Sequence, residues 1–163
     1  MASSRIAKET AQQVPWLHES IVIEAAPKPI WRFVDTSDLN LLKTYIPGIV
    51  DLAPALPHGD RDRMIGSKQS VTIRARSFEI GFELLITKYE YLKLYGFIFL
   101  RHGVALGEQT THLASGEGGT LVTMSYERLG RFWIQQFLRP LILRRYVRAL
   151  NSLKLAVEGG SPS

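Results

Sequence analysis

Tyr126 offers a phenol that could orient a substrate or donate a hydrogen bond during acid–base chemistry. The segment from Thr120 to Arg128 alternates like a strand, so Tyr126 shares one face with Val122 and Met124. If that face lines a cavity, Met124 would contact an apolar ligand and Tyr126 would act as a catalytic group. The alternative is a core tyrosine whose hydroxyl lies at the rim of the core.

Two more candidates for acid–base chemistry, Glu108 and His112, lie in a strand predicted just before Tyr126. The turn between the two strands decides which face points inward, and the sequence leaves both registers open. One register turns Glu108 and His112 inward, where Glu108 would be a candidate general acid or base. The other register turns Gln109, Thr111 and Leu113 inward, and Glu108 is then a solvated residue on the outer face.

Metal and nucleophilic chemistry lack the spacings that they require. The histidines show no i, i+4 pairing, and no HExxH, P-loop, GxGxxG or GxSxG string occurs. The chain contains no cysteine, which excludes disulfides and thiolate ligands. We therefore predict neither a metal site nor a cofactor.

The elements that would position these groups follow from the apolar periodicity. A strand is predicted from Leu17 to Glu24, followed by a Pro-rich stop and two short helices. About six more strands follow, in antiparallel hairpins. The clearest of them alternates apolar and polar residues from Phe78 to Ile86, which gives it only one inward face.

The segment from Arg128 to Val157 reads as one long amphipathic helix. Its apolar stripe recurs in steps of three and four and consists of Leu138, Ile142, Tyr146, Ala149 and Leu153. A helix of this length, placed after the strands, should lie on the concave face of their sheet and leave room for an apolar ligand. Pro140 should kink this helix or begin a new one, and residues 135–139 would then form a lid over the cavity.

The predicted ligand contacts lie on the inward strand faces, on the long helix, on the first short helix and at one strand end. They are Trp31, Phe78, Ile80, Phe82, Leu84, His102, Met124, Leu138, Ile142 and Tyr146. For Trp31 and His102, the alternatives are core packing and a solvated loop.

Basic charge is concentrated in the long helix. Residues 128–157 carry seven Arg or Lys and no Asp or Glu, whereas the formal net charge of the whole chain is +5. Arg144, Arg145 and Arg148 would therefore suit docking to an anionic membrane surface or to a partner enzyme. The alternative is a solvated face balanced by acids elsewhere. No nucleic-acid motif accompanies these residues, so no nucleic-acid partner is predicted.

The bulk composition is that of one globular domain. A chain of 163 residues can bury a full core. We expect a flexible arm over residues 1–16, one domain over residues 17–158 and a flexible tail over residues 159–163, in a monomer or homodimer. No apolar run approaches the ~18 residues of a membrane span, and no secretory signal precedes the first strand, so we expect a cytoplasmic protein.

Several short strings add a family resemblance. They are Ser20–Pro27, Ile30-Trp31 with Phe33, Asp38, Tyr45–Val50, Gly118–Thr120 with Val122-Thr123, and Ala149-Leu150 with Leu153-Lys154 and Glu158. In this order they resemble the SRPBCC superfamily of START-like helix-grip domains, which includes polyketide cyclases/dehydrases. The resemblance implies an α+β fold, in which an antiparallel sheet of about seven strands grips the C-terminal helix around an apolar cavity.

Together these features predict a protein that binds a hydrophobic small molecule of the polyketide, lipid or isoprenoid type. Positioning and acid–base help could make it a cyclase or dehydrase. The alternative is a non-catalytic lipid or quinone carrier, or an accessory protein that docks through its basic helix. Polar side chains converging inside the cavity would favour catalysis, and a purely apolar tunnel would favour carriage.

Overall fold

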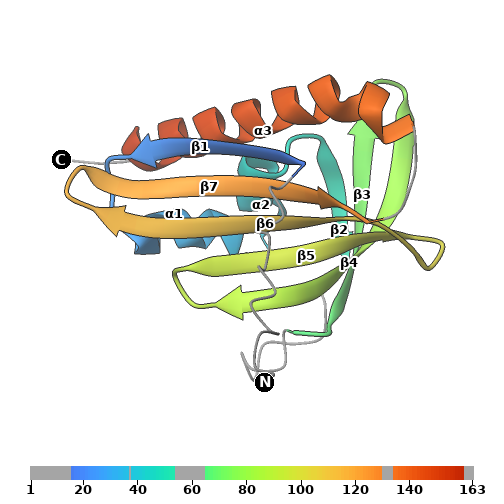
Figure 1. Ribbon diagram of the computed structural model, residues 1–163, viewed down its shortest axis with the longest axis horizontal. Helices are drawn as coiled ribbons and strands as arrows, with labels where there is room; N and C mark the ends of the chain where they lie inside the picture. The colour runs from blue at the N-terminus through green and yellow to red at the C-terminus, as the bar shows by residue number, and fades with distance from the viewer. Residues whose placement is uncertain (1–15, 37, 54–64, 130–133, 160–163) are drawn as a thin grey trace, which may run out of the picture.

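The computed structural model describes residues 16–36, 38–53, 65–129 and 134–159 (Figure 1). Residues 1–15 of the predicted N-terminal arm and residues 160–163 of the predicted C-terminal tail lie outside this description. Trp16, the last residue of the predicted arm, packs against the core, with 5.8 Å between its ring centroid and that of Tyr126.

Seven strands form one antiparallel sheet in the order β1-β7-β6-β5-β4-β3-β2. They are β1 (Leu17–Ile23), β2 (Ile49–Ala53), β3 (Lys68–Ala75), β4 (Phe78–Glu90), β5 (Leu94–Arg101), β6 (Val104–Gly116) and β7 (Gly119–Arg128). Strands β2 to β7 pair with their neighbours in sequence, and β1 joins the far edge by pairing with β7. The sheet curves strongly, so that β3 runs across the direction of β7 in Figure 1.

Two short helices follow β1, as the sequence predicts: α1 (Pro27–Val34) and α2 (Leu39–Tyr45). Pro27 opens α1, where a missing N–H leaves no hydrogen bond unmade. Asp38 caps α2, since its carboxylate accepts a hydrogen bond from the Asn40 amide at 2.8 Å. Gly48, with a φ of 90°, then turns the chain into β2.

The long helix α3 (Ile134–Glu158) lies along β1 and packs against α2 (Figure 1). Tyr146, Ala149 and Leu153 are buried, as the periodicity predicts. Of the two alternatives expected at Pro140, the beginning of a new helix is wrong, because α3 begins at Ile134 and Pro140 lies inside it. The kink and the lid over residues 135–139 stay predictions. The proline removes only its own N–H from the second turn, and the turns on either side continue.

Polar side chains of α3 occupy the outer edge of β1. Lys154 Nζ donates to the carbonyl oxygen of Val22 at 3.0 Å, and Arg139 Nε donates to that of Trp16 at 3.4 Å. The Glu24 amide donates to Glu158 Oε1 at 2.8 Å. These contacts hold the helix against the strand along most of its length.

The core lies between the concave face of the sheet and the helices. Its fully buried side chains come from every layer and include Ile23, Ile30, Phe97, Val122 and Leu153. None of the described helices combines the length and the apolar character that crossing a membrane requires.

Candidate functional site

An apolar pocket of about 400 Å³ lies between α3 and the sheet. Its lining residues come from five strands, from the end of α2 and the connection that follows it, and from α3 between Leu138 and Ala149. They are Tyr45, Ile46, Pro47, Ile73, Ile80, Phe82, Phe99, Leu106, Gln109, Met124, Tyr126, Leu138, Leu141, Ile142, Arg145, Tyr146 and Ala149. A pocket of this volume and character is typical of small-molecule sites.

The strand pattern explains the side of the pocket wall that the sheet forms. Ile80 and Phe82 lie on the inward face of β4, where the alternation of that strand places them. A bulge in β6 adds Leu106, because Phe99 pairs with Gly107 while Leu100 pairs with Ala105. Leu106 is the extra residue, and it lines the pocket.

Tyr126 reaches across β6 because residue 107 is glycine. A Cβ on Gly107 would lie 2.0 Å from Tyr126 Oη, so the phenol lies directly over this glycine. Phe99 flanks the ring, with 6.4 Å between the centroids. Burial raises the pKa of the Tyr126 phenol, which therefore stays protonated at neutral pH. No described residue forms a hydrogen bond with its hydroxyl.

Four other polar side chains form a buried hydrogen-bonded network beside the pocket. Tyr146 Oη donates to Gln109 Oε1 at 3.0 Å, and Gln109 Nε2 donates to Tyr45 Oη at 3.2 Å. The Tyr45 hydroxyl also bonds with the Thr111 hydroxyl. Because Tyr45 accepts the Gln109 proton, its own proton is available to Thr111. The network connects α2, β6 and α3 across the core.

The phenols of this network are weak acids. Burial raises the pKa of Tyr45 to about 12, although the hydrogen bonds with Thr111 and Gln109 lower it. Burial raises the pKa of Tyr146 well above its usual value, and repulsion from Tyr45 and Tyr126 in their ionised forms adds to this. Both phenols therefore stay protonated and act as hydrogen-bond donors.

The hairpin turn settles the register that the sequence left open. Gly116 pairs with Gly119 across a two-residue turn, which places Gln109 opposite Tyr126 and turns Gln109 inward. Glu108 lies on the outer face, where its carboxylate accepts hydrogen bonds from Thr87 Oγ1 at 2.7 Å and from Lys88 Nζ at 3.0 Å.

His112 is exposed on the same outer face as Glu108. The register that would have made Glu108 and His112 catalytic residues is therefore wrong. Of the three predicted catalytic residues, only Tyr126 lines the pocket.

The predicted ligand contacts divide into two groups. Those that line the pocket are Ile80, Phe82, Met124, Leu138, Ile142 and Tyr146. Leu84 is instead buried in the core, and Trp31 is buried with its Nε1 donating to Asp35 Oδ2 at 3.1 Å. His102 is exposed in the turn between β5 and β6.

Phe78 is 71% exposed, so its predicted inward position in the pocket wall is wrong. It opens β4 directly after the tight turn from β3, at the end of the sheet. The alternation of apolar residues along β4 thus extends to Phe78, although this end of the strand is exposed to solvent.

Sequence reasoning missed Tyr45, turned Gln109 inward in only one of the two registers that it left open, and placed Arg145 only on a docking face. Tyr45 and Gln109 lie 64 residues apart, and no local pattern links them. The position of Gln109 opposite Tyr126 is the signal that could have found it, had the turn length been used to choose the register.

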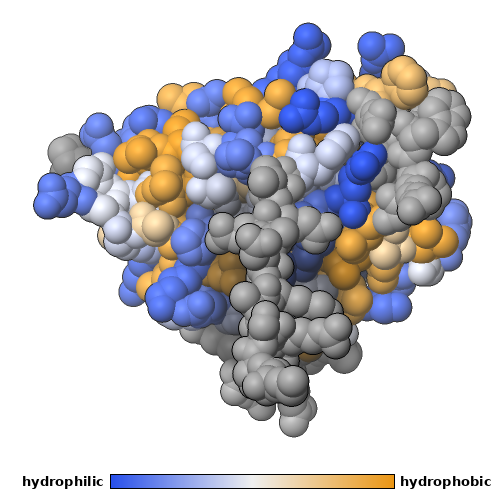
Figure 2. Space-filling model, viewed as in Figure 1, coloured by the Kyte–Doolittle hydropathy of each residue, from blue (hydrophilic) through white to orange (hydrophobic). Residues whose placement is uncertain are grey.

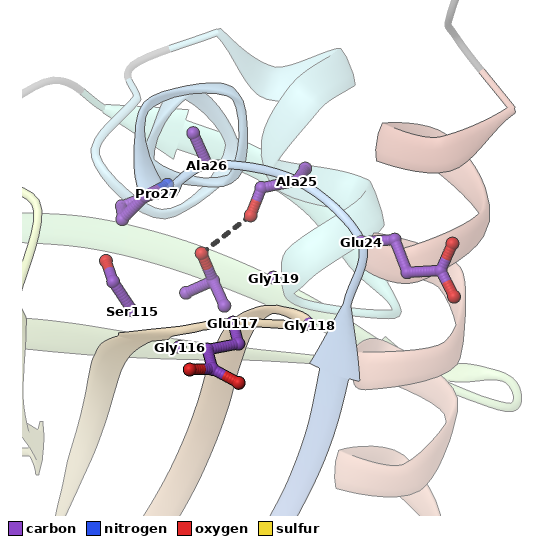
Figure 3. Close-up of a pocket in the computed structure, with 10 residues that line it drawn as sticks. Glu24, Ala25, Ala26, Pro27, Ser115, Gly116, Glu117, Gly118 and Gly119 are labelled. Carbon is purple, nitrogen blue, oxygen red and sulfur yellow. Dashed lines mark hydrogen bonds between the residues drawn. The ribbon is translucent and has the colours of Figure 1, made fainter.

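A second, shallower depression lies where the β6–β7 hairpin meets the connection from β1 to α1 (Figure 3). Its volume is about 690 Å³, larger than that of the apolar pocket. Its walls are mostly backbone and small side chains, and the Thr120 hydroxyl donates to the Ala25 carbonyl oxygen at 2.7 Å. Glu24 points away from it toward α3 in Figure 3. We take the apolar pocket as the candidate site, because converging side chains surround it.

No family model and no curated protein matches this chain. Solved structures do. The Aha1 dimer from Colwellia psychrerythraea is 19% identical over 90% of this chain and 98% of that chain, with a TM-score of 0.63. Ara h 8.0201 is 13% identical over 88% and 97%, with a TM-score of 0.66.

Protein Ms6760 from Mycobacterium smegmatis is also similar, at 16% identity over 89% of this chain and 92% of that chain, with a TM-score of 0.66. The chain has the helix-grip fold. At these identities the likeness shows the fold alone, and the function of this helix-grip domain has to be argued from its pocket.

Proposed function

We propose that this helix-grip domain binds a hydrophobic small molecule of the polyketide, lipid or isoprenoid type between α3 and the sheet. The apolar pocket carries the proposal. Transfer of apolar ligand surface from water to such walls contributes roughly 25 cal/mol per Å². The resemblance of the sequence to START-like domains supports the same function.

Polar side chains converge on the pocket, which is the feature expected of a catalyst, but their chemistry favours recognition over turnover. Gln109 and Tyr146 bond to one another, and the raised pKa of Tyr146 keeps its phenol from removing a proton. The Tyr126 hydroxyl is available to donate a hydrogen bond to the ligand. We therefore propose that Tyr126 orients a carbonyl or hydroxyl oxygen on an otherwise apolar molecule.

Replacing Phe82 by alanine is expected to weaken the binding of a neutral apolar dye, N-phenyl-1-naphthylamine, about fivefold. Phe82 is half-buried and lines the pocket, so the substitution removes apolar contact with the dye. The loss of unfolding free energy should stay below the ~3 kcal/mol of a tightly packed phenylalanine. Fluorescence titration and urea denaturation measure the two effects.

Phe78→Ala is the matched control, because Phe78 lies on the same strand but is 71% exposed. It should leave the affinity for the dye unchanged. Equal affinities of wild type and Phe82→Ala, or no saturable binding of the dye to wild type, would contradict binding in this pocket.

A second function, docking to an anionic membrane surface, is favoured by the exposed side of α3. Arg144 and Arg148 are exposed on the side of the helix away from Tyr146, and hydrophilic side chains project along the top of Figure 2, where α3 lies. Phe137 and Leu141 are 74% and 54% exposed near the start of the helix. Arginines beside exposed apolar residues are typical of helices that lie on membranes. We propose that such docking would bring the pocket to a lipid source.

Changing both Arg144 and Arg148 to glutamine should lower the affinity for vesicles that contain phosphatidylserine by more than about tenfold, since each cation contributes roughly 1 kcal/mol near such a surface. Vesicle sedimentation at low salt measures the affinity. A control with the exposed Lys28 and Arg32 of α1 changed to glutamine loses the same charge and should bind like wild type. Equal losses in both variants would mean that only net charge matters.

A further inference from the structure

Arg145 belongs to the pocket wall rather than to the exposed basic face of α3. It follows Leu138, Leu141 and Ile142 at helical spacing and precedes Ala149 by four residues, and all of these line the pocket. Arg145 is half-buried, whereas Arg144 and Arg148 are exposed.

The pocket is electrically unbalanced at this arginine. Arg145 is the one charged residue among those that line the pocket in the described part of the chain. On the sheet, by contrast, Arg74 pairs with Glu79 at 2.6 Å, and Lys88 pairs with Glu108 at 3.0 Å. No acidic side chain in the described ranges forms an ion pair with Arg145.

A cation beside apolar walls attracts an anion more strongly than a cation in open water, because water screens the interaction less. Its long stem can cover apolar surface while the guanidinium stays at the mouth of the pocket. The planar guanidinium also matches the two oxygens of a carboxylate.

Resting on the proposed ligand-binding function, we infer that the ligand is an anionic amphiphile. Its apolar body occupies the pocket, and its acidic head, a carboxylate or a group of like geometry, pairs with Arg145 at the mouth. The Tyr126 hydroxyl and the Gln109–Tyr146 network lie beside the apolar body of the ligand. They carry no charge, so Arg145 is the residue that pairs with the acidic head.

The test compares decanoate with 1-decanol, which have the same chain length but differ in head-group charge. Isothermal titration calorimetry at about pH 8, where the carboxyl group is ionised, should show wild type binding decanoate about tenfold more tightly than decanol. Arg145→Gln should lower the affinity for decanoate by about the same factor and change that for decanol less than about twofold. Arg148→Gln removes the same charge from outside the pocket and should keep the preference.

Equal affinities of wild type for the two molecules would overturn the inference and leave the proposed function standing. This comparison uses only the wild-type protein, so it tests the inference even if Arg145→Gln folds poorly. Retention of the preference by Arg145→Gln, or its loss in Arg148→Gln, would also overturn it. Failure of both molecules to bind wild type would overturn the proposed function together with the inference.

Discussion

Gly119→Ala should destabilise the domain by about 3 kcal/mol. Gly119 begins β7 with a φ of 124°, a conformation that residues with a Cβ rarely adopt. An added Cβ would also lie 2.2 Å from the carbonyl oxygen of Ile23. This contact is with backbone, so relief requires β1 to move away from the start of β7. Urea denaturation followed by circular dichroism measures the loss.

Gly118→Ala provides the control one residue earlier in the same turn. A Cβ on Gly118 would meet no atom within 4 Å, so this change should alter the unfolding free energy by less than about 0.5 kcal/mol. If the two alanine variants have similar stabilities, the close approach of β1 to the hairpin is incorrect.

Leu153→Ala should lower the unfolding free energy by about 2–5 kcal/mol, because it leaves a cavity where α3 packs on the sheet. The side chain of Leu153 is 0% exposed, and it lies outside the pocket lining. A loss of this size is a large fraction of the ~5–15 kcal/mol that stabilises most domains. Thermal and urea denaturation should show the decrease.

Leu155→Ala changes the same residue type two positions along the helix, where the side chain is 74% exposed. It should shift the unfolding free energy by less than about 0.5 kcal/mol. A comparable loss in both variants would contradict the packing role of the buried face, because alanine is a better helix former than leucine and neither change weakens the helix itself. Intact affinity for N-phenyl-1-naphthylamine in folded Leu153→Ala would show that the pocket survives the cavity.

The sequence predicts the elements and much of the pocket wall, because both follow from local periodicity. Ile80 and Phe82 alternate with charged or small residues, and Ile142 and Tyr146 recur at helical spacing. Each pattern gives its element one apolar face, and one sheet with one long helix leaves few ways to join those faces.

The polar part of the site could not be predicted in the same way. Gln109 and Thr111 are polar, and so are Glu108 and His112 on the other face of the strand, so hydropathy alone does not choose between the two registers. Their partner Tyr45 comes from a helix more than sixty residues earlier, and only the folded chain brings them together. Arg145 is different, because its spacing of three residues from Ile142 and four from Ala149 already places it beside the apolar stripe, although the sequence-based prediction assigned it to the docking face.

The contacts between α3 and the outer edge of β1 also affect how copies of the chain behave toward one another. An edge strand whose amides and carbonyls are free can pair with a strand from another molecule, which leads to aggregation. On β1, the carbonyl oxygen of Val22 accepts a hydrogen bond from Lys154. Just beyond the strand, the amide of Glu24 donates one to Glu158. A foreign strand can add along this edge only after α3 detaches. The same helix that forms one wall of the pocket therefore protects the β1 edge of the sheet against self-association, whereas β2 forms the other edge.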